Sequence, residues 1–270
     1  MSARKAVVTL SMVLFIVTLS YAIAVGVMGP IPTFQVRKLA RFYLINTYNP
    51  FHRFLSAMTP AGVTAIVWDF RGLDTLYETA VFYLAIVSTV LLMRRIVPRP
   101  RRPKGLSLIS KAGTKFVIAL TLVVAAAIAL HGHLTPGGGF QAGSAAAVTS
   151  SLIIVVYSLY SLIRVGASKE RLLAVRSAGL FGIALTSISL FIIGLLTGST
   201  GFIMQNQPKP GAPLGFPYMF AGMLVSGTPL ILNILEAMAV AMAFTLLFFV
   251  LSVPEEDASK ALSAGGEEGE

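Results

Sequence analysis

The sequence has no cysteine, which excludes disulfide bonds, thiolate metal sites and iron–sulfur clusters from this chain. Charged residues are also scarce, at 12% against 56% hydrophobic residues, whereas a soluble domain carries about 25% charged residues. Water is therefore not the main solvent of this chain. We predict an all-α fold, a polytopic integral membrane protein with about seven transmembrane helices.

The apolar stretches set the predicted spans, because a bilayer core of about 30 Å needs about 20 mostly apolar residues per helix. The predicted spans are Ala6–Met28, His52–Trp68, Leu73–Met93, Phe116–Leu130, Gln141–Ile163, Ser177–Gly198 and Gly222–Leu251. The last span has an alternative start at Pro229, since proline is well tolerated in a first helical turn. The first stretch lacks a convincing cleavage pattern, so we expect a retained helix rather than a signal peptide.

Prolines and basic residues gather between the third and fourth predicted spans, and this change of composition predicts a domain boundary. We expect a three-helix membrane domain over residues 1–97, a basic linker over 98–115 and a four-helix membrane domain over 116–252. The acidic segment 253–270 is rich in glycine and glutamate and lacks the apolar content to pack, so we expect a disordered tail.

Lys and Arg residues are retained on the cytoplasmic side of a membrane. With the basic linker inside, most of the 21 Lys and Arg residues fall on that side, which predicts an external N-terminus and a cytoplasmic C-terminus. The net charge of +10 then belongs to short loops that set the topology and contact anionic lipid head groups. We predict a multi-pass protein of the cell membrane and no nucleic-acid partner.

The 11 acidic residues lie mostly in the tail, and those near the spans are Asp69, Asp74, Glu78 and Glu236. Ionisable groups at membrane depth indicate a functional site by default. Asp74 and Glu78 share one face of the predicted third span, and Arg71 is the nearby cation. Asp69, Arg71 and Asp74 therefore form either a salt-bridged turn at the interface or part of an ion path.

Glu236 lies inside the last predicted span. It is about 21 Å from the helix start if the span begins at Gly222, and about 10 Å deep if it begins at Pro229. A carboxylate at that depth does not face lipid. Glu236 either holds helices together as a protonated or paired group, or relays protons or cations. Asn233 lies on the same face.

The run HGHLTPGGGF separates the fourth and fifth predicted spans. His131 and His133 could ligate a metal, but no third ligand lies near them, so we expect no metal site. The glycines are not a phosphate loop, because they follow an apolar helix and lack the Lys-Ser/Thr ending. Pro136 and Gly137–Gly139 interrupt the helix, either at membrane depth or as a tight turn at the interface. We expect no cofactor and no catalytic site.

Two longer motifs resemble subunits of Mrp-type (Mnh-type) cation/proton antiporters. The segment HGHLTPGGGFQAG (His131–Gly143), with Thr228 and Pro229 before the last span, resembles the B subunit. The segment TAIVWDFRGLDTLYE (Thr64–Glu78) resembles the end of the large A subunit, which is a separate small subunit in archaeal membrane-bound hydrogenases and sulfane reductases. The chain is therefore similar to a fused accessory subunit of these complexes.

The resemblance implies an all-helical subunit that assembles with large complex-I-like and small accessory membrane subunits, and with a redox module of the hydrogenase or sulfane-reductase type. It implies Na⁺ and proton translocation by the whole assembly. Two departures from the family pattern stand out. Asn233 lies where the B-type pattern has an acidic residue, with Glu236 one turn on, and Tyr77 replaces a glycine of the A-type pattern, so its helix approaches a neighbour less closely.

The predicted function is a membrane subunit of a multisubunit Na⁺/H⁺ antiporter module within a redox-driven ion-pumping complex, contributing buried carboxylates to ion translocation. The candidates for that role are Glu236, Glu78, Asp74, Asp69, Arg71, His131, His133 and Asn233. The alternative is a purely structural subunit with no ion path of its own. A hydrated polar cavity beside Glu236 or Glu78 would favour the first hypothesis.

Overall fold

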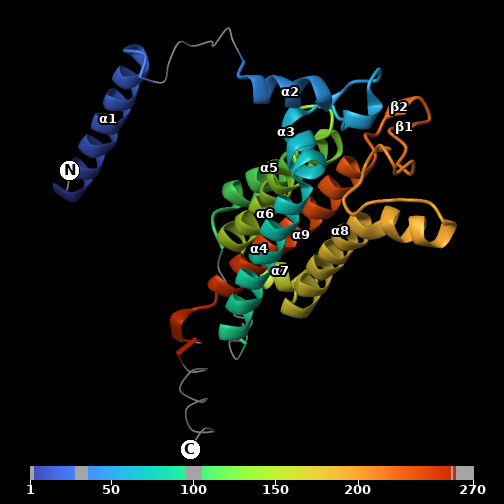
Figure 1. The fold of residues 1–270 in the computed structure, drawn as a ribbon. Coiled ribbons are helices and arrows are strands. Elements are labelled where there is room, and N and C mark those ends of the chain that lie inside the picture. The colour runs from blue at the N-terminus through green and yellow to red at the C-terminus, as the bar shows by residue number, and fades with distance from the viewer. Residues whose placement is uncertain (1–2, 28–35, 95–104, 257, 260–270) are drawn as a thin grey trace, which may run out of the picture. The chain divides into compact units, whose positions relative to one another are not determined.

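The fold is almost entirely helical, as predicted. A computed structural model describes residues 3–27, 36–94, 105–256 and 258–259. The elements are α1 Ala3–Ala24, α2 Lys38–Thr47, η1 Arg53–Leu55, α3 Gly62–Ala65, η2 Ile66–Phe70, α4 Gly72–Leu92, α5 Leu108–His131, α6 Gly139–Val156, α7 Leu159–Arg164, α8 Lys169–Thr197, β1 Met219–Phe220, β2 Met223–Leu224 and α9 Thr228–Leu251 (Figure 1). The chain divides into two units, Met1–Phe42 and Tyr43–Glu270.

Six of the described helices are long and apolar enough to cross a membrane: α1 from Lys5 onward, α4, α5, α6, α8 and α9. This confirms the predicted polytopic membrane protein. Much of the predicted linker 98–115 and most of the predicted tail 253–270 lie outside the described residues.

The predicted span His52–Trp68 is wrong, because short elements replace a continuous helix there. The side chain of Asn49 accepts hydrogen bonds from the backbone N–H groups of Phe51 and His52, which turns the chain into η1. Met58 then adopts a left-handed φ of 51°, and the ring of Pro60 removes a backbone donor. The helix resumes only at α3 and widens into the π-helical turn η2.

The helix α9 lies at the centre of the second unit. It packs against α4, α5, α6, α8 and η2. Half of the residues in its apolar stretch are buried inside the fold, compared with 11% for α4. Glycines allow the neighbouring backbones to approach α9 closely. A Cβ atom at Gly143 of α6 would lie 2.7 Å from the Cβ of Val240, and one at Gly179 of α8 would lie 2.9 Å from the carbonyl oxygen of Leu235. Small residues at such contacts are typical of membrane helix pairs.

The helix α8 begins earlier than the predicted span Ser177–Gly198, because Ser168 caps it by accepting a hydrogen bond from the N–H of Arg171 at 3.2 Å. Arg176, which the topology prediction placed in a loop, therefore lies inside the helix and is only 1% exposed. Its Nη2 atom donates to the carbonyl oxygen of Phe82 at 3.1 Å, and its guanidinium lies 4.8 Å from the ring centre of Tyr83.

The predicted span Gln141–Ile163 is divided into two helices near its C-terminal end. The helix α6 stops at Val156, and Ser158 caps the separate short helix α7 by accepting a hydrogen bond from the N–H of Ser161 at 3.3 Å. Apolar length alone did not reveal this break, since a serine next to a tyrosine interrupts no hydrophobic run.

Candidate functional site

The acidic residue Glu236 lies inside α9, about 12 Å from the start of the helix at Thr228. The structure therefore has the later of the two predicted helix starts. Glu236 is 8% exposed and Asn233, one turn earlier, is fully buried. In the part of the chain that the structure describes, no Lys or Arg side chain forms an ion pair with Glu236.

The first turn of α6 lies against Glu236. A Cβ atom at Gly139 would lie 2.5 Å from both the Oε2 atom of Glu236 and the carbonyl oxygen of Asn233. The carboxylate faces the backbone N–H of Phe140, one of the first N–H groups of α6 that lack a partner within the helix. The partial positive charge at a helix N-terminus stabilises a carboxylate placed there. The glycine run thus lets a helix begin directly beside Glu236.

Trp68 closes the same site from η2. Its Nε1 atom donates to the Oδ1 atom of Asn233 at 3.1 Å, and the indole also faces Glu236. The ring is completely buried. Trp68 was not among the predicted site residues, although it is the only tryptophan in the chain and lies directly before Asp69 in the motif WDFRG.

The turn between α5 and α6 supports Asn233 from the other side. Thr64 donates to the carbonyl oxygen of Gly132, and a Cβ atom at Gly132 would lie 3.0 Å from the Nδ2 atom of Asn233. That Nδ2 atom has no hydrogen-bond partner among the described residues. A buried donor without a partner is costly, so this amide is available to a ligand or a water molecule beside Glu236.

The two histidines have different surroundings, and His131 does not belong to the site. The ring of His131 contacts the carbonyl oxygen of Ala127 in its own helix at 3.2 Å. His133 is 3% exposed, and its Nε2 atom lies 3.0 Å from the carbonyl oxygen of Leu224. Burial lowers the pKa of His133, opposed by that contact. Among the described residues no group of three metal-ligating side chains is present.

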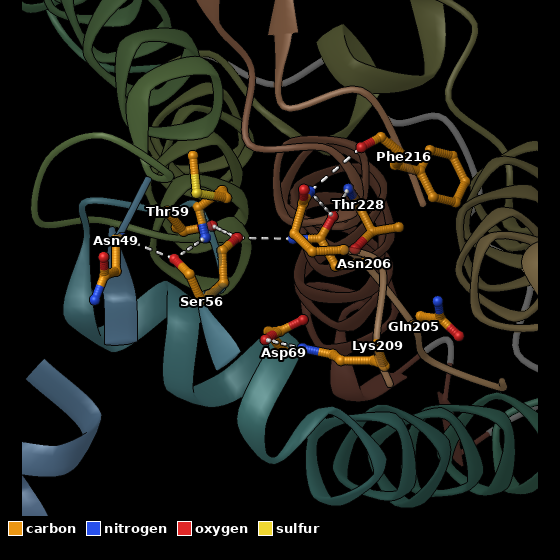
Figure 2. Close-up of polar contacts among 12 residues, drawn as sticks. Asn49, Ser56, Thr59, Asp69, Gln205, Asn206, Lys209, Phe216 and Thr228 are labelled. Carbon is orange, nitrogen blue, oxygen red and sulfur yellow. Dashed lines mark hydrogen bonds and ion pairs between the residues drawn. The ribbon is translucent and has the colours of Figure 1, made fainter. Parts of the chain in front are cut away.

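The residues of the predicted turn are arranged in two ion pairs. Arg71 pairs with Asp74, and both side chains are largely exposed. Asp69 instead faces Lys209 at 4.0 Å and its side chain is only 4% exposed (Figure 2). Burial raises the pKa of Asp69 to about 6, and the charge of Lys209 opposes that rise. All four residues line a pocket of about 490 Å³ between the start of α4 and the loop after α8.

Asn206 fixes that loop against the start of α9 (Figure 2). Its Nδ2 atom donates to the carbonyl oxygens of Ala57 at 2.8 Å and Ser226 at 3.0 Å. Its Oδ1 atom accepts from the backbone N–H of Thr228 at 3.0 Å, which satisfies one of the free donors at the start of α9. No sequence pattern indicates this role, because the contacts join residues far apart in the chain.

Glu78 is the remaining candidate, and it lies on the exposed side of α4. It is close enough to Glu236 for the two charges to repel each other. The structure thus brings Glu236, Asn233 and Glu78 into one neighbourhood, places Asp69, Arg71 and Asp74 at an adjoining pocket, and leaves His131 outside. Around Glu236 the buried side chains of Trp68 and Asn233 offer N–H donors, and the exposed Glu78 offers a second carboxylate. This arrangement suits the binding and release of a proton or a small cation.

The chain is similar to known membrane proteins. A family profile described as a domain related to the MnhB subunit of the Na⁺/H⁺ antiporter matches residues 109–246. No curated protein matches the sequence significantly.

Two solved structures contain chains with a similar fold. One is the membrane-bound sulfane sulfur reductase (MBS), an archaeal respiratory membrane complex, with a TM-score of 0.65 and 21% identity over 92% of this chain and 100% of that chain. The other is the Mrp complex from Dietzia sp. DQ12-45-1b, with a TM-score of 0.58 and 20% identity over 94% of this chain and 26% of that chain.

Proposed function

Because this chain belongs to the family of domains related to the MnhB subunit of the Na⁺/H⁺ antiporter, we propose that it is a membrane subunit of a multisubunit Na⁺/H⁺ antiporter module in which Glu236 takes part in ion translocation. The observation that carries the role of Glu236 is its burial inside α9 without an ion-pair partner among the described residues. A carboxylate at that depth is costly unless its charge is neutralised.

The geometry supports exchange of a proton for a cation at Glu236. When protonated, the carboxyl group is neutral and can stay among apolar side chains. When a cation arrives, the group releases its proton and the charge of the cation replaces it. The N–H of Phe140 and the indole of Trp68 stabilise the carboxylate between these states. The nearby charge of Glu78 disfavours ionising both acids together, which favours one proton or one cation at this place.

The second candidate function is assembly alone. The contact of Gly139 with Glu236 and the hydrogen bond between Trp68 and Asn233 favour a rigid junction between η2, α6 and α9. In that case Glu236 is a permanently protonated group that only holds helices together.

The wider setting is also part of the proposal. We place the chain in an assembly of large and small antiporter-module subunits, attached to a redox module of the hydrogenase or sulfane-reductase type. The likeness to chains of the Mrp complex and of the sulfane reductase complex supports this setting. The residues up to 97 correspond to the end of an A-type subunit and residues 116–252 to a B-type subunit, with the C-terminus in the cytoplasm. The six described spans place both termini on the same side of a membrane, so the predicted external N-terminus does not fit this orientation.

The test of Glu236 is a pair of substitutions in the purified, reconstituted complex. Glu236→Gln keeps the shape and hydrogen bonding but cannot titrate, so we expect normal assembly and loss of about 90% or more of coupled Na⁺ or H⁺ transport. Glu236→Asp should retain part of the transport. Glu170→Gln, which changes an exposed carboxylate in the first turn of α8, is the matched control. Full transport by Glu236→Gln would leave assembly as the function of this residue.

A further inference from the structure

One side of α4 exposes a regular row of residues. Asp74, Glu78, Val81, Ala85 and Ser88 are all exposed, and they follow one another by alternating steps of four and three. This spacing is the seven-residue repeat by which one helix packs along another. We call this row the α4 stripe. It lies within a membrane span of which little is buried by the rest of the described chain.

The exposed face of α5 differs from the α4 stripe. It carries bulky apolar residues such as Phe116, Leu120 and Val123, which suit contact with lipid tails. Small and polar residues instead favour packing of one membrane helix against another. Bulky side chains such as Val81 and Leu84 are exposed on α4 as well, so it is the carboxylates Asp74 and Glu78 that set the α4 stripe apart from the face of α5.

The charge of Glu78 is the clearest difference between the α4 stripe and the exposed face of α5. Asp74 has its own counter-ion in Arg71, but Glu78 has no ion pair within the described parts of the chain. Glu78 lies about 9 Å from the start of α4, where a carboxylate facing lipid is strongly disfavoured. The nearby Glu236 adds negative charge to its surroundings. Glu78 therefore lacks a counter-ion among the described residues, and a cation from elsewhere has to neutralise it.

We propose that the α4 stripe is the docking surface for a transmembrane helix of another membrane subunit, and that this helix carries a Lys or Arg side chain opposite Glu78. Lipid tails cannot neutralise a carboxylate. A second copy of this chain is a less suitable partner, because Arg71 is already paired with Asp74 and the cations Lys111 and Lys115 lie in the first turns of α5. That end of the bundle is the far end of α6 from Phe140, since Tyr157 donates to the carbonyl oxygen of Lys111.

The proposal rests on the membership of an assembly stated above, but not on ion transport by Glu236. The first experiment replaces Val81 of the α4 stripe with a photo-reactive amino acid in the full chain, expressed with its native membrane partners. The matched control replaces Val123 of α5, which is almost equally exposed, at 67% against 66% for Val81. We expect Val81 to cross-link to another subunit within one turn of a Lys or Arg residue, and Val123 to cross-link to lipid.

The other outcomes contradict the proposal in distinguishable ways. Cross-links to a subunit at Val123 but not at Val81 would overturn the α4 stripe and leave the assembly intact. So would a Val81 cross-link to α1 of the same chain, or to a partner helix without a nearby Lys or Arg. If neither position reached another subunit and the chain purified alone, the α4 stripe and the proposed function would fail together.

A charge exchange provides the second test. Glu78→Lys places like charges opposite each other, so we expect about a tenfold lower yield of the assembled complex. Changing the cross-linked Lys or Arg of the partner to Glu should restore most of that yield in combination with Glu78→Lys. A double variant that assembles no better than Glu78→Lys alone would exclude the proposed ion pair.

Discussion

The acidic residues of this chain fall into two regions with different surroundings. At the start of α4 each acid meets a base, Asp74 with Arg71 and Asp69 with Lys209. Inside the bundle Glu236 faces the N–H groups of Phe140 and Trp68 and the like charge of Glu78, and no described Lys or Arg side chain pairs with it. A paired acid is already neutralised and fixes the position of its partner, whereas an acid that lacks a partner has to gain a proton or a cation from elsewhere.

This difference suggests a division of labour. The contacts of Asn206 fasten the loop after α8 over the start of α9, and Lys209 of that loop offsets part of the cost of burying Asp69. The region around Glu236 is held instead by close backbone contacts, such as that of Gly139 with Asn233 and Glu236.

The close contact at Gly139 should be the most sensitive point of the unpaired region. Gly139→Ala would place a Cβ atom 2.5 Å from the carbonyl oxygen of Asn233, so α6 must move away from Glu236. We expect a loss of about 3 kcal/mol of stability, visible as a much lower yield of folded protein in detergent. Gly138→Ala is the control, since its Cβ would meet only the flexible end of Gln141. Equal yields for the two variants would contradict the close packing.

The paired region should respond to pH through Asp69. Its pKa is raised from 3.8 to about 6, so the folded state binds the proton more tightly than the unfolded state does. The contribution to stability is therefore full below about pH 4 and is lost as the pH rises through 6. Asp69→Asn should remove this pH-dependent decrease in the free energy of unfolding, which is about 3 kcal/mol. The measurement is the apparent unfolding temperature as a function of pH.

Lys209→Met tests the cause of that pH dependence. Lys209 lowers the pKa of Asp69, so its removal should move the decrease in stability to higher pH. An unchanged pH profile in this variant would show that the two side chains do not interact in solution.

Composition and motifs predicted much of this molecule, and long-range contacts explain what they did not predict. Membrane class, five of the spans in the second unit and the burial of Glu236 follow from apolar length and rare charge. The failure at His52–Trp68 has a local cause, the left-handed Met58, which no hydrophobic pattern reports. Trp68 and Asn206 act through partners more than a hundred residues away, so the sequence could not show their roles without the fold.

The glycine run shows the same limit at the scale of single residues. The motif identified Gly137–Gly139 as a break in the helix, and the structure has a turn between α5 and α6 there. Which glycine matters depends on what each one touches. Gly138 has an extended φ of 161°, which any residue adopts, whereas Gly139 lies against Asn233 and Glu236.

The smallest effect is expected at the exposed ion pair of Arg71 and Asp74. Both side chains are more than half exposed, so water screens their attraction, and such surface pairs contribute about 0 to 1 kcal/mol. Asp74→Asn should therefore leave the apparent unfolding temperature almost unchanged and lack the pH dependence expected of Asp69. If Asp74→Asn instead reduces ion transport while stability is unchanged, Asp74 acts at the mouth of the pocket as an ion-path residue. A large loss of stability would contradict the distinction between exposed and buried pairs, because it would mean that this pair is covered in the folded protein.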